Sequence, residues 1–209
     1  KLHTQYSICE GAIKIEDLEK LCKSNKINSI GISDTSNLCG VLQFSETVSK
    51  SKTQPIIGTQ IKFKYKGIVG LIPIIAKNEL GYKNIVTLSS NSYLIHKNFN
   101  EPFCEIKDLE KYNEGLIVTL GGLNSLAGDL YKKDKLEELK EIYTYLKKLL
   151  GDNFYIEIQR HDDLNEKSLE IYNLKLSQEL EIPIIASHEV FYLDKDLYEA
   201  HDALICIGS

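Results

Sequence analysis

The sequence has no hydrophobic run close to the roughly 20 apolar residues that a membrane-spanning helix requires, so no such helix is expected in these 209 residues. It also has no basic leader ending in small residues, so secretion is not expected. Methionine is absent altogether, even at the start. Either the start has been trimmed or modified methionines are missing from the sequence, and in the second case the motif spacings shift by one.

The cysteines and the charges also lack the patterns of some common protein classes. The five cysteines include no Cys-x-x-Cys pair and are odd in number, which disfavours a zinc knuckle or a disulfide framework. Scattered cysteines of this kind favour reduced thiols in the cytoplasm. Lysine and arginine number 25 against 30 acidic residues, for a net charge of −5. Because nucleic-acid affinity comes largely from phosphate neutralisation, we do not expect a main DNA-binding surface.

Apolar runs alternate with amphipathic helical patterns along the whole chain. Helical spacing predicts helices at Ile15/Leu18/Cys22 and Val41/Phe44/Val48, around 82–88 and near 169–180, and most clearly over 136–150. Seven strands are expected: the opening run and residues 29–33, 55–61, 69–76, 116–119, 154–159 and 183–187. This order predicts an α/β fold whose parallel sheet closes into a distorted barrel, in one domain over residues 1–209.

Histidine and carboxylate side chains follow several of these strands, at the end of the barrel where chemistry is expected. They are His3, Glu10, Asp34, His161, His188 and Glu189. Both residue types donate lone pairs to divalent cations, so together they could form a polynuclear metal site. The alternative is that they are ordinary polar loop residues, and Asp34 could simply begin a turn or cap the next helix.

Eight segments occur in an order that resembles a known family. They are HTQYSICEGAIKIEDL, ISDTSNLCGVLQF, QPIIGTQ, AKNELGYKNIVTLSS, NEGLIVTLGG, FYIEIQRH, IPIIASHEVFYLD and AHDALICIG. Together they resemble the N-terminal polymerase-and-histidinol-phosphatase (PHP) domain of bacterial DNA polymerase III alpha subunits. The resemblance covers nearly the whole chain and implies a distorted seven-stranded βα barrel of the PHP type.

The resemblance also places the metal ligands of the family on this chain. Six positions keep a residue of related chemistry and are expected to be vestigial: His3, Glu10, Asp34, Gln60, His161 and Glu189. Four ligand positions are lost: Lys1, Thr35, Leu71 and Phe191. A cysteine found in some relatives aligns with Gly122. Because a cation cluster needs mostly anionic or imidazole ligands, we expect no bound metal and no catalytic residue in these 209 residues.

The resemblance implies a module of a replicative DNA polymerase. The parent chain would be a cytoplasmic DNA-directed DNA polymerase (a nucleotidyltransferase) whose palm, with its Mg²⁺, lies beyond residue 209. The module itself would be inactive, serving as a structural element and as a docking surface for the proofreading exonuclease subunit. Other replicase subunits and primer–template DNA would be partners of the parent chain, with no membrane.

Two other function classes remain open from the sequence. One is an active metal-dependent phosphoesterase, either a proofreading 3′–5′ exonuclease or a pyrophosphatase, supported by the retained residues. The other is a stand-alone enzyme of the amidohydrolase or histidinol-phosphatase kind, which would need a more complete ligand set.

Lys1 stands where the family has its first ligand histidine. Without a metal, Glu10, Asp34 and Glu189 would repel one another unless they acquire a positive partner. By strand alternation Lys1 points to the same side as His3. We therefore predict an ion pair from Lys1 to Glu10 or Glu189; the alternative is a lysine frayed into solvent.

Overall fold

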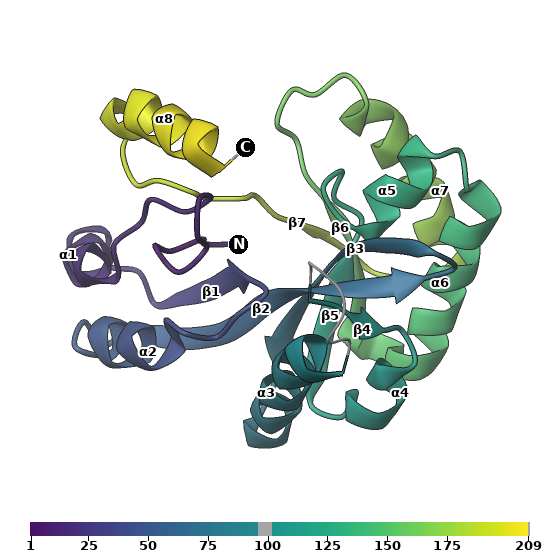
Figure 1. Cartoon of the computed structure of the whole chain (residues 1–209), viewed down its shortest axis with the longest axis horizontal. Helices are drawn as coiled ribbons and strands as arrows, with labels where there is room; N and C mark the ends of the chain where they lie inside the picture. Colours follow the sequence, from purple (N-terminus) through teal and green to yellow (C-terminus); the bar gives the residue numbers. More distant parts are fainter. Residues whose placement is uncertain (96–101, 209) are drawn as a thin grey trace. The chain divides into compact units, whose positions relative to one another are not determined.

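The computed structural model describes residues 1–95 and 102–208 (Figure 1). In chain order its elements are α1 (Ile15–Asn25), β1 (Ser29–Thr35), α2 (Val41–Ser49), β2 (Gln54–Tyr65), β3 (Ile68–Ala76), α3 (Glu79–Leu94), β4 (Cys104–Glu105), α4 (Asp108–Tyr112), β5 (Leu116–Leu120), α5 (Leu126–Lys132), α6 (Leu136–Leu150), η1 (Gly151–Asn153), β6 (Phe154–Ile158), α7 (Glu166–Leu180), β7 (Ile184–Ala186), η2 (Lys195–Leu197) and α8 (Tyr198–Gly208). They group into two compact units. Unit 1 comprises Lys1–Gln60 and Glu189–Ser209, and unit 2 comprises Ile61–His188.

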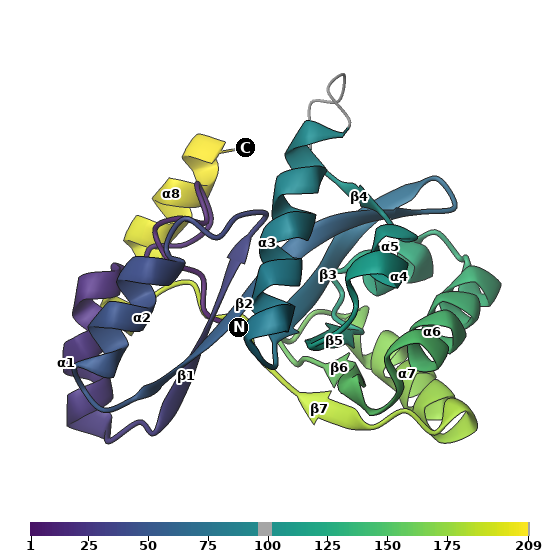
Figure 2. The ribbon, with the colours of Figure 1, turned by 90° about the horizontal axis from the view of Figure 1, so that it is seen from below.

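Unit 1 is built on the parallel pair formed by β1 and the first half of β2, with Ile32 opposite Ile57. Helices α1 and α2 pack against each other, as Figure 2 shows. The two predicted apolar stripes, Ile15/Leu18/Cys22 and Val41/Phe44/Val48, are buried in the core of this unit. Helical spacing of apolar residues therefore predicted both helices and the faces that they bury.

The opening segment of unit 1 forms single bridges and not the strand that we predicted. Leu2 bridges Ile32 of β1 and also Val190. The Ser33 N–H donates to the Leu2 carbonyl at 2.9 Å, and the His3 N–H donates to the Val190 carbonyl at 2.9 Å. The segment is thus held from both sides, which fixes the backbone that carries Lys1 and His3.

Unit 2 contains the second half of β2 with β3 to β7, in a mixed sheet. Strand β3 pairs antiparallel with β5, whereas β5 and β6, and β6 and β7, pair in parallel. The prediction of a parallel sheet is wrong at β3. Only two residues, Lys66 and Gly67, separate β2 from β3, and a parallel crossover requires a dozen or more.

The helices of unit 2 follow the sequence pattern closely. Helix α6 has the predicted bounds, buries five residues of its stripe, and packs on β5 and β6. Helix α3 is longer than the predicted 82–88, because Asn78 caps its start by accepting a hydrogen bond from the Gly81 N–H at 2.9 Å. Figure 2 shows α6 and α7 side by side.

Over the described ranges the chain has seven strands, hydrogen-bonded in the order β1-β2-β3-β5-β6-β7 with β4 on β2. The predicted α/β class and strand number are confirmed, although β4 replaces the opening run as a member. The single domain over residues 1–209 stays a prediction. Within 1–95 and 102–208 no helix is both long and apolar enough to cross a bilayer.

Candidate functional site

Glu189 is the centre of a buried polar network in unit 1. Its Oε1 lies 2.6 Å from the Lys1 ammonium, and its Oε2 lies 2.5 Å from His3 Nε2. Gln60, at the end of the first half of β2, donates from Nε2 to Glu189 Oε2 at 3.3 Å. The predicted ion pair of Lys1 is confirmed, with Glu189 as its partner. Lys1 and His3 do lie on the same side of the opening segment, as strand alternation predicted.

The charges of this network keep Glu189 ionised. Burial would raise the pKa of Glu189, but the hydrogen bond from His3 and the positive charge of Lys1 outweigh burial and lower the pKa to about 2. An ionised carboxylate only accepts hydrogen bonds, so His3 must carry its proton on Nε2. The side chains of Lys1 and Glu189 are only 12% and 13% exposed, so water screens their attraction weakly.

Asp34, at the end of β1, has its own set of hydrogen-bond donors. Its carboxylate accepts from the Thr4 N–H at 2.6 Å, the Thr4 hydroxyl at 2.7 Å and the Ser7 hydroxyl at 2.7 Å. The residue is 1% exposed. Three donors from the opening loop therefore compensate the buried charge of Asp34 without a cation. Asp34 therefore does not cap the next helix.

At two more positions where the metal ligand of the family is lost, the residue that is present contacts a residue at a retained position. The Thr35 hydroxyl donates to Glu10 Oε2 at 2.5 Å. The Phe191 ring stacks on His3, with ring centroids 4.4 Å apart. On its other side Phe191 meets His201 of α8, whose Nε2 lies 2.7 Å from the Glu10 carbonyl oxygen. An aromatic stack thus fills space beside His3 and attaches α8 to the loop that carries Glu10.

His161 and Leu71 lie in unit 2. His161 Nδ1 lies 2.7 Å from Glu166 Oε1, and its ring meets His188 edge-on with centroids 4.2 Å apart. Burial raises the pKa of Glu166, but the hydrogen bonds from the side chain and backbone of His161 outweigh it and lower the pKa overall. Leu71 is a half-buried residue of β3 and offers no lone pair. His161 is therefore held by a carboxylate on the first turn of α7.

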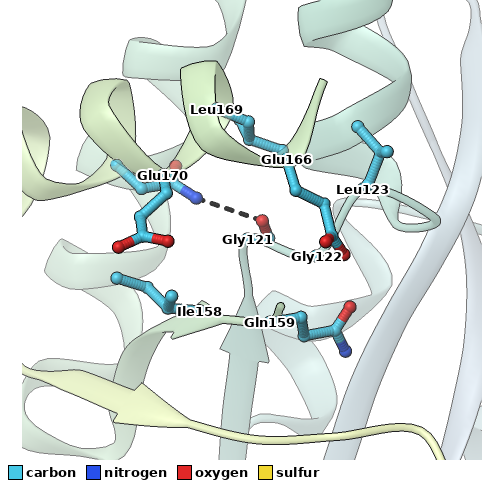
Figure 3. Close-up of a pocket in the computed structure, with 9 residues that line it drawn as sticks. Gly121, Gly122, Leu123, Ile158, Gln159, Glu166, Leu169 and Glu170 are labelled. Atoms are coloured by element: carbon cyan, nitrogen blue, oxygen red, sulfur yellow. Dashed lines mark hydrogen bonds between the residues drawn. The ribbon is translucent and has the colours of Figure 1, made fainter. Parts of the chain in front are cut away.

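Gly122 lies against the end of the Gln159 side chain, at the position where some relatives have a cysteine. A Cβ at this position would lie 2.6 Å from Gln159 Oε1. Figure 3 shows the loop around Gly121 and Gly122 with Gln159 and Glu166 beside it, where a cavity of about 10 Å³ has room for one water. A cysteine here would require Gln159 to move.

Sequence reasoning missed two buried carboxylates, Glu166, which binds His161, and Glu157 of β6. The second has the larger set of donors. Glu157 is 1% exposed and accepts hydrogen bonds from Thr119 at 2.8 Å, Gln159 at 2.5 Å and Ser187 at 2.5 Å. The signal was present in the sequence, because a charged residue stands inside the apolar run FYIEI. A buried acid in a strand needs donors, and those donors come from the ends of three strands of unit 2.

The donor set of unit 1 does not fit the divalent ions that the family resemblance implies. Lys1 brings a positive charge onto Glu189, Gln60 presents an N–H group, and Phe191 has no lone pair. The oxygens of Asp34 are already occupied by hydrogen-bond donors. Across residues 1–95 and 102–208 no three His, Cys, Asp or Glu side chains are grouped so that they could hold a metal ion.

Comparison with curated proteins finds DNA polymerase III alpha subunits among the relatives of this chain. The chain is 36% identical over its full length to the DNA polymerase III subunit alpha of Rickettsia prowazekii, and 34% identical to that of Borreliella burgdorferi. It covers 18% and 19% of those two proteins, so it spans less than a fifth of the length of its relatives.

Solved structures give the same fold at low sequence identity. A protein assigned as a metal-dependent phosphoesterase, from Bifidobacterium adolescentis, matches with a TM-score of 0.59 at 10% identity, over 100% of this chain and 96% of that one. An amidohydrolase from Chromobacterium violaceum matches with a TM-score of 0.55 at 8% identity, over 97% and 95%. The family model described as the PHP domain matches residues 1–161. This chain therefore belongs to the PHP domain family.

Proposed function

We propose that this chain is the N-terminal PHP module of a replicative DNA polymerase III alpha subunit and that the module itself has no catalytic activity. The parent chain is a DNA-directed DNA polymerase whose Mg²⁺-dependent palm lies beyond residue 209. The similarity to full-length alpha subunits supports the first part. The contacts in unit 1 support the second part.

The observation that carries the proposal is the way substituted residues pair with retained ones. Lys1 and Gln60 bind Glu189, Thr35 binds Glu10, and Phe191 stacks on His3. The first three contacts use carboxylate oxygens that a metal would otherwise need, and the fourth places an apolar ring against His3. A site that is still under selection for catalysis would keep those groups available to a cation and a substrate.

A retained fold with an inactivated site suits a structural and docking role. We propose that the module binds the separate proofreading exonuclease subunit, alongside contacts to other replicase subunits. A pull-down with the purified exonuclease subunit tests this, comparing the 209-residue chain with the full-length chain. Retention by both supports docking on this module, whereas retention by the full-length chain alone places the exonuclease site elsewhere.

We expect no nuclease activity from the 209-residue chain. A labelled primer–template incubated with the chain and Mn²⁺ should keep its length, because Lys1, His3 and Gln60 already bind the Glu189 carboxylate. The control is the His3→Ala variant, which should give the same result as the unsubstituted 209-residue chain. Nucleotide release that requires Mn²⁺ and disappears in His3→Ala or His161→Ala would contradict the proposal.

We also expect weak binding of duplex DNA. With a net charge of −5 the chain can neutralise few phosphates, so counterion release contributes little. Fluorescence anisotropy with a short duplex at physiological salt should give a dissociation constant above the micromolar range. Sub-micromolar binding with a steep salt dependence would instead reveal a segregated basic face.

The second candidate is an active metal-dependent phosphoesterase, either an exonuclease or a pyrophosphatase. One observation favours it: Glu166 holds His161 by one ring nitrogen, which is how carboxylates orient a histidine that binds metal. Against it, the retained residues of unit 1 stand beside Lys1, Gln60 and Phe191, which do not favour a cation. We therefore rank this function second.

A further inference from the structure

The loop that joins β6 to α7 in unit 2 exposes a large apolar side chain. Leu164 is 95% exposed, more than any other large apolar residue in the part of the chain that the structure describes. Figure 1 shows this loop projecting from the sheet before α7 begins. A single exposed leucine is common on protein surfaces. Leu164 therefore indicates a function only through the residues around it.

The loop is held to α7 at both of its ends. At its start, the Arg160 guanidinium makes two hydrogen bonds to the Glu170 carboxylate, at 2.6 and 3.0 Å. Further along, the His161 N–H donates to Glu166 Oε2 at 2.5 Å. A side chain on a fixed loop loses less conformational entropy when it binds than one on a flexible loop. Leu164 is therefore presented in a way that favours binding.

Leu164 lines a groove in which acids outnumber bases. The groove has a volume of about 380 Å³, and its charged residues are Arg160, Asp162, Asp163, Glu166, Lys167 and Glu170. Arg160 is paired with Glu170, and Glu166 binds His161. Within the described ranges no ion pair reaches Asp162 or Asp163, whose side chains are exposed. The groove therefore has a net negative charge and two carboxylates that can accept a basic group.

The groove continues into an apolar stripe on α7. Residues three and four apart lie on the same side of a helix, so Lys167, which lines the groove, is followed on one face by Ile171 and Leu174. Ile171 is 62% exposed and Leu174 is 39% exposed. The buried face of α7 is a different one and contains Leu169 and Leu176. The groove and the stripe form one surface, which we call the α7 surface: Asp162, Asp163, Leu164, Lys167, Ile171 and Leu174.

We propose that the α7 surface binds a segment of a partner protein that carries an arginine or lysine beside a large apolar side chain. The basic side chain pairs with Asp162 and Asp163, and the apolar side chain packs on Leu164. Charge complementarity favours this occupant, because a surface with an acidic excess repels nucleic acid and anionic lipid. The stripe extends the surface beyond the size of a small cation. The inference goes beyond the proposed function and does not depend on polymerase activity in the parent chain.

Peptide selection on the full-length protein tests the chemistry of the occupant. A phage-displayed library of short random peptides is first depleted on the variant Asp162→Asn/Asp163→Asn/Leu164→Ser and is then selected on the wild type. Enriched peptides should combine arginine or lysine with leucine, isoleucine or phenylalanine. Enrichment of acidic or wholly polar peptides would overturn the proposal, and so would a selection that enriches nothing.

Fluorescence anisotropy with the most enriched peptide measures the two contributions separately. Asp162→Asn with Asp163→Asn, and Leu164→Ser alone, should each weaken binding about tenfold. The matched controls are Asp152→Asn and Leu42→Ser, which change an exposed acid and an exposed leucine elsewhere and should bind as the wild type does. All substituted side chains are exposed, so every variant should keep the wild-type melting temperature.

Two results would overturn the proposal at this stage. One is equal binding of the peptide by the wild type and by the Asp162, Asp163 and Leu164 variants, which would place the peptide elsewhere on the protein. The other is Leu164-dependent binding to phosphatidylcholine vesicles in place of peptide binding, which would assign the α7 surface to a membrane.

Discussion

Replacing Lys1 by alanine should destabilise the protein by roughly 3–5 kcal/mol, the usual cost of removing one partner from a buried ion pair. Glu189 would keep its charge in a pocket where its side chain is 13% exposed, and the donors His3 and Gln60 would not replace the lost positive charge. The substitution should be made in a chain extended upstream, so that residue 1 is not also the amino terminus. Urea unfolding of both proteins at pH 7 gives the difference in free energy.

The matched control for Lys1→Ala is Lys23→Ala. Lys23 pairs with Glu19 one turn away on α1, and its side chain is 57% exposed, so the loss should be only about 0.3–0.5 kcal/mol. EDTA should change the stability of neither protein. A loss below about 0.5 kcal/mol for Lys1→Ala would show that water or another cation compensates Glu189.

Glu189→Gln should remove the part of the pH dependence of stability that comes from this carboxylate. Because the pKa of Glu189 falls from its ordinary value of 4.5 to about 2 in the folded chain, the ionised group stabilises the fold at pH values above 4.5. That stabilisation, about 3 kcal/mol, is lost as the pH falls from 4.5 towards 2, where the folded state also takes up the proton.

The measurement is the free energy of unfolding of both proteins between pH 7 and pH 2. The difference between wild type and Glu189→Gln should be largest near neutral pH and should shrink towards pH 2. The control is Glu79→Gln, since Glu79 pairs with Lys83 on an exposed helix surface and should show almost no difference at any pH. A difference for Glu189→Gln that stays constant with pH would show that its charge is not what stabilises the fold.

The helices and the class of fold could be predicted from the sequence because local patterns determine them. The stripe of α6 and the glycine that ends it lie within 16 consecutive residues, and the structure has the predicted bounds. The antiparallel direction of β3 was harder to predict from the sequence. The short turn at Lys66 and Gly67 indicates a hairpin between β2 and β3 only when the ends of both strands are known. The sequence pattern did not show that β2 is 12 residues long.

Part of the candidate site could be predicted, because the family resemblance gave the ligand positions and the charges of the residues there indicated an ion pair. The pairing of Lys1 with Glu189 joins residues 188 positions apart, and it followed from the need to compensate carboxylates left without a metal. Thr35 on Glu10 and Phe191 on His3 did not follow, because a hydroxyl or a ring has many possible partners. The donors around Glu157 were missed because they come from three different strands of unit 2.

Metal analysis most directly tests whether the residues of unit 1 have replaced the metal site of the family. The protein should be purified without chelators and then incubated with Zn²⁺, Mn²⁺ or Fe²⁺ before gel filtration. If Lys1, Gln60 and Phe191 have closed the site, mass spectrometry should find far less than one equivalent of each metal per chain. One or more equivalents of bound metal, removed by EDTA with a fall in melting temperature, would contradict the replacement of the metal site by these residues.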